Sequence, residues 1–144
     1  MLQIPCLGYD DALRAITTIT AALKAAGKSA VVAVADQQGE LIALARLDGA
    51  PYPSIQIAAN KAWTAARERR PSSEIGQSSR ASGGGFDMTC YGDLRYTGFG
   101  GGIPVVMGDA VLGAVAVSGL STGEDIDLAE KGVAAILGGL DPKS

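Results

Sequence analysis

Two segments of this chain place polar side chains beside glycines or at the ends of strand-like runs, an arrangement that is typical of small-molecule pockets. The first carries Arg46, Asp48 and Lys61, and the second carries three glycines, Ser118 and Asp125. The candidate ligand-binding residues in these segments are Arg46, Asp48, Lys61, Gly100, Gly101, Gly102 and Ser118. Their side chains can hold a small polar molecule, and Lys61 with Asp125 can transfer protons.

The charged residues of the first segment each allow two interpretations. Arg46 and Asp48 share one face of a strand, so they either form an ion pair with each other or face a ligand together. Lys61 lies beside an alanine-rich helix face, so its amine either reaches a cleft at the sheet edge or extends into solvent. The sequence leaves both alternatives open.

The glycine run of the second segment lacks the surroundings of a phosphate-binding loop. No helix-like pattern follows it and no Gly-Lys-Ser/Thr motif ends it. The glycines therefore indicate a sharp turn or a close approach between backbones, with or without a ligand. Ser118 has no histidine to activate it as a nucleophile. Asp125 stands near the start of an expected helix, where a carboxylate caps or stabilises the first turn.

A glycine-rich loop over residues 83–102 carries the most varied chemical groups of the chain. Cys90 and Tyr91 are candidates for proton transfer, and Arg95 and Tyr96 are candidates for ligand binding. The candidate catalytic residues are therefore Lys61, Asp125, Tyr91 and Cys90. If the loop folds over a cleft it supplies specificity, and if not, it forms a contact between subunits.

The absence of histidine excludes more kinds of catalytic and metal site than any other feature of the composition. With none in the sequence, Ser-His-Asp and Cys-His catalysis, histidine-based zinc sites and histidine ligation of haem are excluded. No metal site is predicted. Two cysteines, Cys6 and Cys90, are too few for a disulfide framework, which favours a reducing cytoplasm.

Composition points to a globular domain. The 144 residues are 47% hydrophobic and 19% charged, which favours one domain over residues 1–144. A net charge of -3 without a basic stripe disfavours nucleic-acid binding. Residues 1–5 lack a signal-peptide pattern and the apolar runs are strand-sized, so we expect neither export nor a membrane, and predict a cytoplasmic location.

Hydrophobic periodicity predicts the elements that position these groups. Helices are expected over 11–26, from a cap at Ser54 to before Pro71, over 72–79 and over 124–137, the last ended by Gly138 and Gly139. Strands are expected over 30–35, 41–47, 103–107 and 110–118, as two hairpins. This order lacks strand-helix alternation, so it predicts an α+β fold with an antiparallel sheet.

Several motifs, in order, resemble the GlcG/HbpS family, which includes the C-terminal domain of PduO. They are residues 31–36 (VVAVAD) through Gly39, 45–50 (ARLDGA), 59–62 (ANKA) with 64–66 (TAA), 100–105 (GGGIPV), 113–119 (GAVAVSG), and Asp125 with Ala129. The resemblance covers most of the chain except residues 71–99.

The resemblance implies a profilin-like α+β domain, with an antiparallel five-stranded sheet flanked by helices, assembled into dimers or rings up to octamers. It also implies binding of haem or another tetrapyrrole, in the setting of small-molecule catabolism. Because the chain has no histidine, iron would need a tyrosine, cysteine, methionine, lysine or oxygen ligand.

Three functions follow as expectations. The first is an oligomeric small-molecule-binding protein of the GlcG/HbpS type, with haem as the inherited ligand. The first alternative is a cofactor-free lyase, isomerase or hydrolase that acts on a small anionic or aromatic metabolite. The second alternative is a structural or regulatory oligomeric partner protein.

Overall fold

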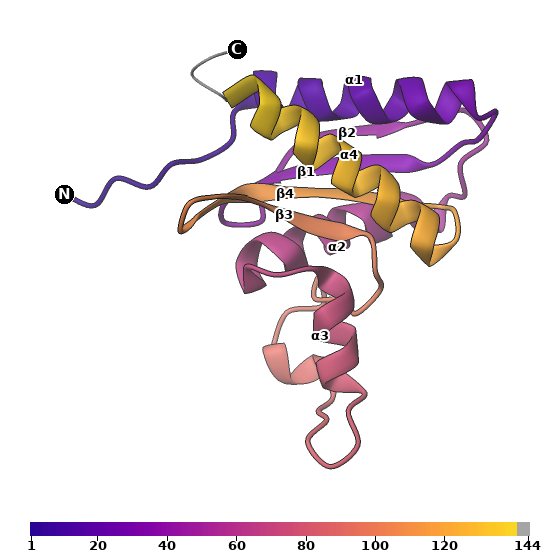
Figure 1. Ribbon diagram of the computed structural model, residues 1–144. Coiled ribbons are helices and arrows are strands. Elements are labelled where there is room, and N and C mark those ends of the chain that lie inside the picture. Colours follow the sequence, from indigo (N-terminus) through magenta and orange to yellow (C-terminus); the bar gives the residue numbers. More distant parts are fainter. Residues whose placement is uncertain (141–144) are drawn as a thin grey trace.

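The computed structural model describes residues 1–140, which form four α-helices, a short 3-10 helix and one antiparallel sheet (Figure 1). In chain order the elements are α1 (Tyr9–Ala25), β1 (Val31–Asp36), β2 (Leu41–Arg46), α2 (Pro53–Glu68), α3 (Ser72–Ser79), η1 (Met88–Tyr91), β3 (Gly102–Met107), β4 (Ala110–Ser118) and α4 (Thr122–Leu140). The predicted α+β class and both hairpins are confirmed. None of the described helices is long and apolar enough to cross a membrane.

The sheet has four strands in the order β2-β1-β4-β3, rather than the expected five. No apolar alternating run remains for a fifth strand, because the segment between α3 and β3 is rich in glycine and folds as turns and η1. The segment before α1 meets β4 through a backbone hydrogen bond, from Leu7 to Leu112 at 2.9 Å, and does not continue as a strand.

The helices cover the sheet from both sides (Figure 1). On one side, α1 and α4 pack against Val32 and Val34 of β1. On the other side, Ala58 and Ala62 of α2 pack against the small side chain of Ala33. Small residues on both surfaces let α2 lie close to the sheet, as its alanine face predicts.

Several helix ends differ from the sequence expectation, and α1 and α4 each begin two residues earlier than expected, at Tyr9 and Thr122. α2 begins at Pro53 rather than being capped by Ser54, because proline suits the first helical position, where its missing N–H is no loss. α4 continues through Gly138 and Gly139 to Leu140, so the predicted stop is wrong. Leu140 packs on the core cluster beneath α1 and α4, and this burial outweighs the weak helix propensity of the glycines.

Candidate functional site

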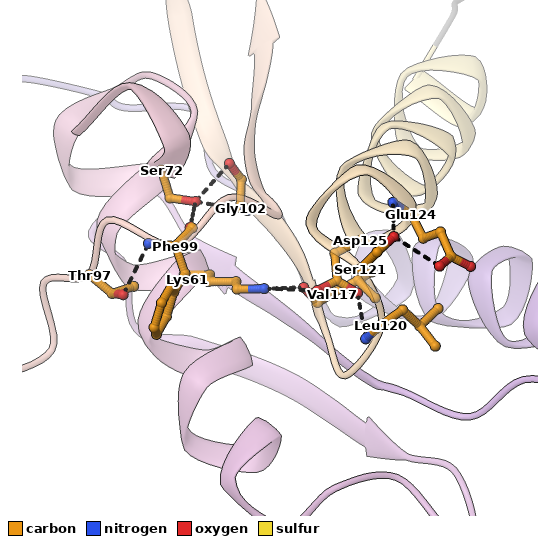
Figure 2. A network of polar contacts seen from close by, with 10 residues as sticks. All are labelled: Lys61, Ser72, Thr97, Phe99, Gly102, Val117, Leu120, Ser121, Glu124 and Asp125. Atoms are coloured by element: carbon orange, nitrogen blue, oxygen red, sulfur yellow. Dashed lines mark hydrogen bonds and ion pairs between the residues drawn. The ribbon is translucent and has the colours of Figure 1, made fainter. Parts of the chain in front are cut away.

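A buried ion pair lies where α2, the end of β4 and the start of α4 meet (Figure 2). Lys61 Nζ donates to the Val117 carbonyl at 2.8 Å and to Asp125 Oδ2 at 3.2 Å. Asp125 Oδ1 accepts from the N–H of Leu120 at 3.1 Å. Lys61 and Asp125 are each only 3% exposed. Of the two alternatives for Lys61, extension into solvent is therefore wrong.

Burial changes the proton affinity of the amine. It lowers the pKa of Lys61 because the charged form loses hydration, and the carboxylate of Asp125 only partly opposes this by favouring the ammonium. A lysine with a lowered pKa releases its proton more readily near neutral pH than an exposed lysine does. The pair can therefore exchange a proton as well as hold three elements together.

The start of α4 is arranged so that Asp125 is free to face Lys61. The hydroxyl of Ser121 accepts from the N–H of Glu124 at 3.3 Å and donates to the Glu124 carboxylate at 2.8 Å, so Ser121 caps the helix. The carboxylate of Asp125, which the sequence predicts to cap the helix or stabilise its first turn, lies in the first turn and joins the ion pair.

The glycine run lets β3 begin directly against α2. At Gly102 a Cβ atom would lie 2.3 Å from the backbone oxygen of Lys61, and at Gly101 it would lie 2.9 Å from Lys61 Nζ. Gly101 also has φ at 122°, a conformation that favours glycine. The predicted close approach between backbones is confirmed at these two positions.

A cleft of about 290 Å³ opens beside the ion pair. It is lined by Ser54, Ile57, Lys61, Phe99, Gly100, Ser118, Gly119, Leu120, Thr122 and Asp125. Ser54 and Ser118 are 5% and 4% exposed, and neither hydroxyl is hydrogen-bonded to any residue within 1–140. Among the described residues, Trp63 Nε1 is the buried side-chain polar atom without a partner, whereas these two hydroxyls remain accessible from the cleft, where a water or a ligand can pair with them.

The lining also sets the charge and shape of a suitable ligand. Lys61 and Asp125 carry opposite charges, and within residues 1–140 no other ionisable residue lines the cleft. Ile57, Leu120 and Phe99 supply apolar walls, and the Phe99 ring is largely exposed. The cleft is therefore suited to an uncharged molecule with an apolar part and hydrogen-bonding oxygens.

A second cleft, of about 420 Å³, lies at the end of β2 and contains Arg46, Asp48 and Tyr52. Among the described residues Arg46 forms no ion pair with Asp48, and its guanidinium lies 5.5 Å from the centroid of the Tyr52 ring. The ion-pair alternative for Arg46 and Asp48 is thus wrong. The two residues share a cleft that is separate from the one containing Lys61.

Comparison with known proteins identifies the family. Residues 7–134 match the family model described as "Haem degrading protein HbpS-like". The chain belongs to the HbpS-like family. This confirms the resemblance to GlcG/HbpS that the sequence motifs indicated.

Three further matches place the HbpS-like chain among known proteins. An uncharacterized 15.0 kDa protein from the dhaT-dhaS intergenic region of Citrobacter freundii is 35% identical over 100 residues, which are 69% of this chain and 70% of the relative. The crystal structure of Klebsiella pneumoniae ORFY has a TM-score of 0.88 at 26% identity and covers 95% of this chain and 94% of its own. PduOC in its heme complex has a TM-score of 0.82 at 23% identity, over 90% of this chain and 94% of its own, and shows a shared fold.

The remaining four candidates of this HbpS-like chain lie outside both clefts. Tyr91 and Tyr96 stack with ring centroids 4.0 Å apart, and the Arg95 guanidinium lies 3.3 Å from the ring centroid of Trp63 on α2. The Tyr91 hydroxyl bonds to the Glu68 carboxylate, and burial, followed by this contact, raises the pKa of Tyr91. Cys90 is an exposed free thiol. These contacts fasten residues 80–101, here called the α3–β3 segment, onto α2.

Two residues that line the cleft, Ser54 and Phe99, were not predicted as binding residues from the sequence. Ser54 is predicted as a helix cap, yet its side chain makes no capping hydrogen bond. Phe99 lies in the glycine-rich loop over residues 83–102, where no local pattern marks it as a binding residue. The available signal is Pro53, because a proline at the first helical position leaves the next serine without a capping role.

Proposed function

We propose that this HbpS-like chain binds a small, uncharged aromatic molecule in the cleft beside Lys61. The observation that carries the proposal is the pair of hydroxyls of the buried residues Ser54 and Ser118, which lack partners among the described residues and line that cleft. Oxygen atoms of a ligand satisfy these hydroxyls. The exposed ring of Phe99 offers an apolar face against which an aromatic ring stacks.

A non-reactive probe, 4-hydroxybenzyl alcohol, tests the proposal. It is titrated into ¹⁵N-labelled protein, and we expect saturable shifts of the amide signals of Gly100, Gly119 and Leu120. The double variant Ser54→Ala/Ser118→Ala should bind about tenfold more weakly, which corresponds to about 1.4 kcal/mol.

The matched control is Ser78→Ala, which removes a hydroxyl from α3 outside the cleft. It should bind the probe as the wild type does. Absence of saturable shifts in the wild type, or equal affinity for the double variant and the control, would refute the proposed site.

Haem is the second candidate, because PduOC shares the fold and forms a heme complex. The cleft at Lys61 suits haem poorly, because Lys61 and Asp125, the ionisable side chains of its described lining that could ligate iron, are paired with each other. The cleft at Arg46 does fit, since the phenol of Tyr52 can ligate iron and the guanidinium of Arg46 can pair with a propionate. Bound there, haem would supply redox chemistry.

A hemin titration of the purified protein separates the two clefts. If haem binds at Arg46, the Soret band shifts saturably in the wild type and in Tyr9→Phe, which changes an exposed tyrosine on α1. Tyr52→Phe should lose that shift. No saturable shift in the wild type, or an unchanged shift in Tyr52→Phe, would remove haem from this cleft.

A further inference from the structure

We infer that Lys61 is a carbonyl-reactive amine that captures small aromatic aldehydes in the cleft as an imine. The inference rests on the proposed ligand site and goes beyond it, because it gives Lys61 a covalent role and names the reactive group of the ligand. The sequence offers a cofactor-free lyase, isomerase or hydrolase as its first alternative function, and the inference supplies such an enzyme with a nucleophile, Lys61.

The geometry holds the amine ready for attack. As a neutral amine, Lys61 has two N–H groups, which match the two acceptors it contacts, the Val117 carbonyl and Asp125 Oδ2. With both donors engaged, the nitrogen lone pair is left without a partner, and Lys61 lines the cleft. A side chain fixed by two hydrogen bonds also loses little freedom when it reacts.

The surroundings distinguish Lys61 from the other described lysines. Lys24, Lys28 and Lys131 are exposed, and the ammonium of Lys28 is paired with Glu124. Lys61 is 3% exposed, and its burial lowers its pKa. Exposed lysines are almost fully protonated near neutral pH, whereas attack on a carbonyl requires the free amine.

The reaction balances with groups that are present. Asp125 takes a proton from the Lys61 ammonium, and the freed lone pair forms a C–N bond as the carbonyl electrons move to oxygen. Asp125 returns that proton to the oxygen, which gives a carbinolamine whose nitrogen still carries two protons and the positive charge. Asp125 then takes a proton from the carbinolamine nitrogen and passes it to the hydroxyl, which leaves as water while the C=N bond forms. The products are a protonated imine and water, so the positive charge of the ammonium is retained on the imine nitrogen and no oxidant or reductant is consumed.

The unpaired hydroxyls complete the arrangement. Ser54 and Ser118 can donate to oxygens of the aldehyde or of the carbinolamine, which need donors once they leave water. Protonated imines draw electrons from neighbouring bonds, which is the property that amine-dependent lyases and isomerases use.

Reductive trapping tests the inference on the wild-type chain. The protein is incubated with 4-hydroxybenzaldehyde and cyanoborohydride near neutral pH, and the modified lysines are located by peptide mapping. We expect Lys61 to be labelled at least about tenfold faster than Lys24, Lys28 or Lys131, because its burial leaves more of the amine unprotonated near neutral pH. Excess 4-hydroxybenzyl alcohol should slow the labelling of Lys61 alone. Labelling confined to exposed lysines, or equal at all of them, would overturn the inference.

Two variants that retain Lys61 test whether Asp125 takes part in the reaction. Asp125→Asn, which keeps an acceptor for Leu120, should slow the labelling of Lys61, and Ser78→Ala should leave it unchanged. If 4-hydroxybenzyl alcohol binds and Lys61 stays unlabelled, the covalent role fails while the binding site stands. If Lys61 is labelled selectively and the alcohol does not bind, the proposed ligand fails while the reactive amine stands.

Discussion

Lys61 places a titratable amine in the interior, so the free energy of unfolding depends on pH in the alkaline range. Its pKa in the folded chain lies below the ordinary value of 10.5. Between the two pKa values the unfolded chain binds more protons than the folded chain, so the free energy of unfolding increases as pH rises. We predict that the wild type gains stability relative to Lys61→Met from neutral pH towards 10.5, the value for the unfolded chain.

Urea denaturation of both proteins across this range measures the difference. The comparison cancels the titration of other groups, which the two proteins share. A difference in the free energy of unfolding that stays constant, or that moves against the wild type as pH rises, would contradict a lowered pKa.

The two kinds of buried serine should respond differently to loss of the hydroxyl. Ser72 Oγ donates to the Phe99 carbonyl at 2.7 Å and accepts from the Gly102 N–H at 3.0 Å, whereas Ser118 makes no such bond among the described residues. We predict that Ser72→Ala lowers the free energy of unfolding by about 2 kcal/mol. Ser118→Ala should leave it unchanged or raise it by about 1 kcal/mol, since an unpaired polar group is removed.

Urea unfolding of the two variants gives the comparison directly. Equal destabilisation would mean that Ser118 serves the fold rather than a ligand.

Sequence reasoning found Lys61, Ser118 and Asp125 because each stands at a recognisable place, a helix face, a strand end or a helix start. It could not show that Lys61 and Asp125 form an ion pair, because the contacts of Lys61 join α2 to β4 and α4, which are distant in sequence. Ser54 and Phe99 depend on packing between distant segments, which leaves no local pattern.

At the scale of elements, the junction between α2 and β3 depends on the absence of a side chain at Gly102. A Cβ atom there would lie 2.3 Å from the Lys61 backbone oxygen, and backbone cannot give way as a flexible side chain can. We predict that Gly102→Ala lowers the free energy of unfolding by about 3 kcal/mol through overpacking. It should also disturb the Lys61 amine and weaken ligand binding.

The control is Gly123→Ala, in the first turn of α4, where nothing lies within 4 Å of the added Cβ. Alanine there should stabilise the helix by about 0.5 kcal/mol. Thermal and urea unfolding of the pair measure both effects. A Gly102→Ala protein as stable as the control would show that β3 does not rely on this close approach.

The regular elements were predictable because their apolar residues repeat with the period of a helix or strand, and turn residues mark their ends. The α3–β3 segment was not, because Tyr91 and Tyr96 find their partners on α2, in Trp63 and Glu68. Because such partners are distant in sequence, the sequence alone cannot decide whether this segment covers a cleft or forms a contact between subunits.

At the scale of the whole molecule, the two edges of the sheet differ. β3 carries Pro104, which offers no N–H to another strand. β2 is apolar from Leu41 to Ala45, with neither a charge nor a proline in that run, and Leu41 is 50% exposed. An open apolar edge strand can pair with a strand of another chain, so β2 is the surface through which we expect the oligomer to form.

We predict that copies of this chain associate through β2, and that Leu41→Lys, which puts a charge on that edge, shifts the protein to monomer. The matched control is Leu94→Lys, which changes a leucine that is 88% exposed in the α3–β3 segment. Sedimentation velocity of the three proteins decides between the surfaces. Dissociation by Leu94→Lys alone would move the contact to the α3–β3 segment, and a wild type that sediments as a monomer at all concentrations would contradict association through either surface.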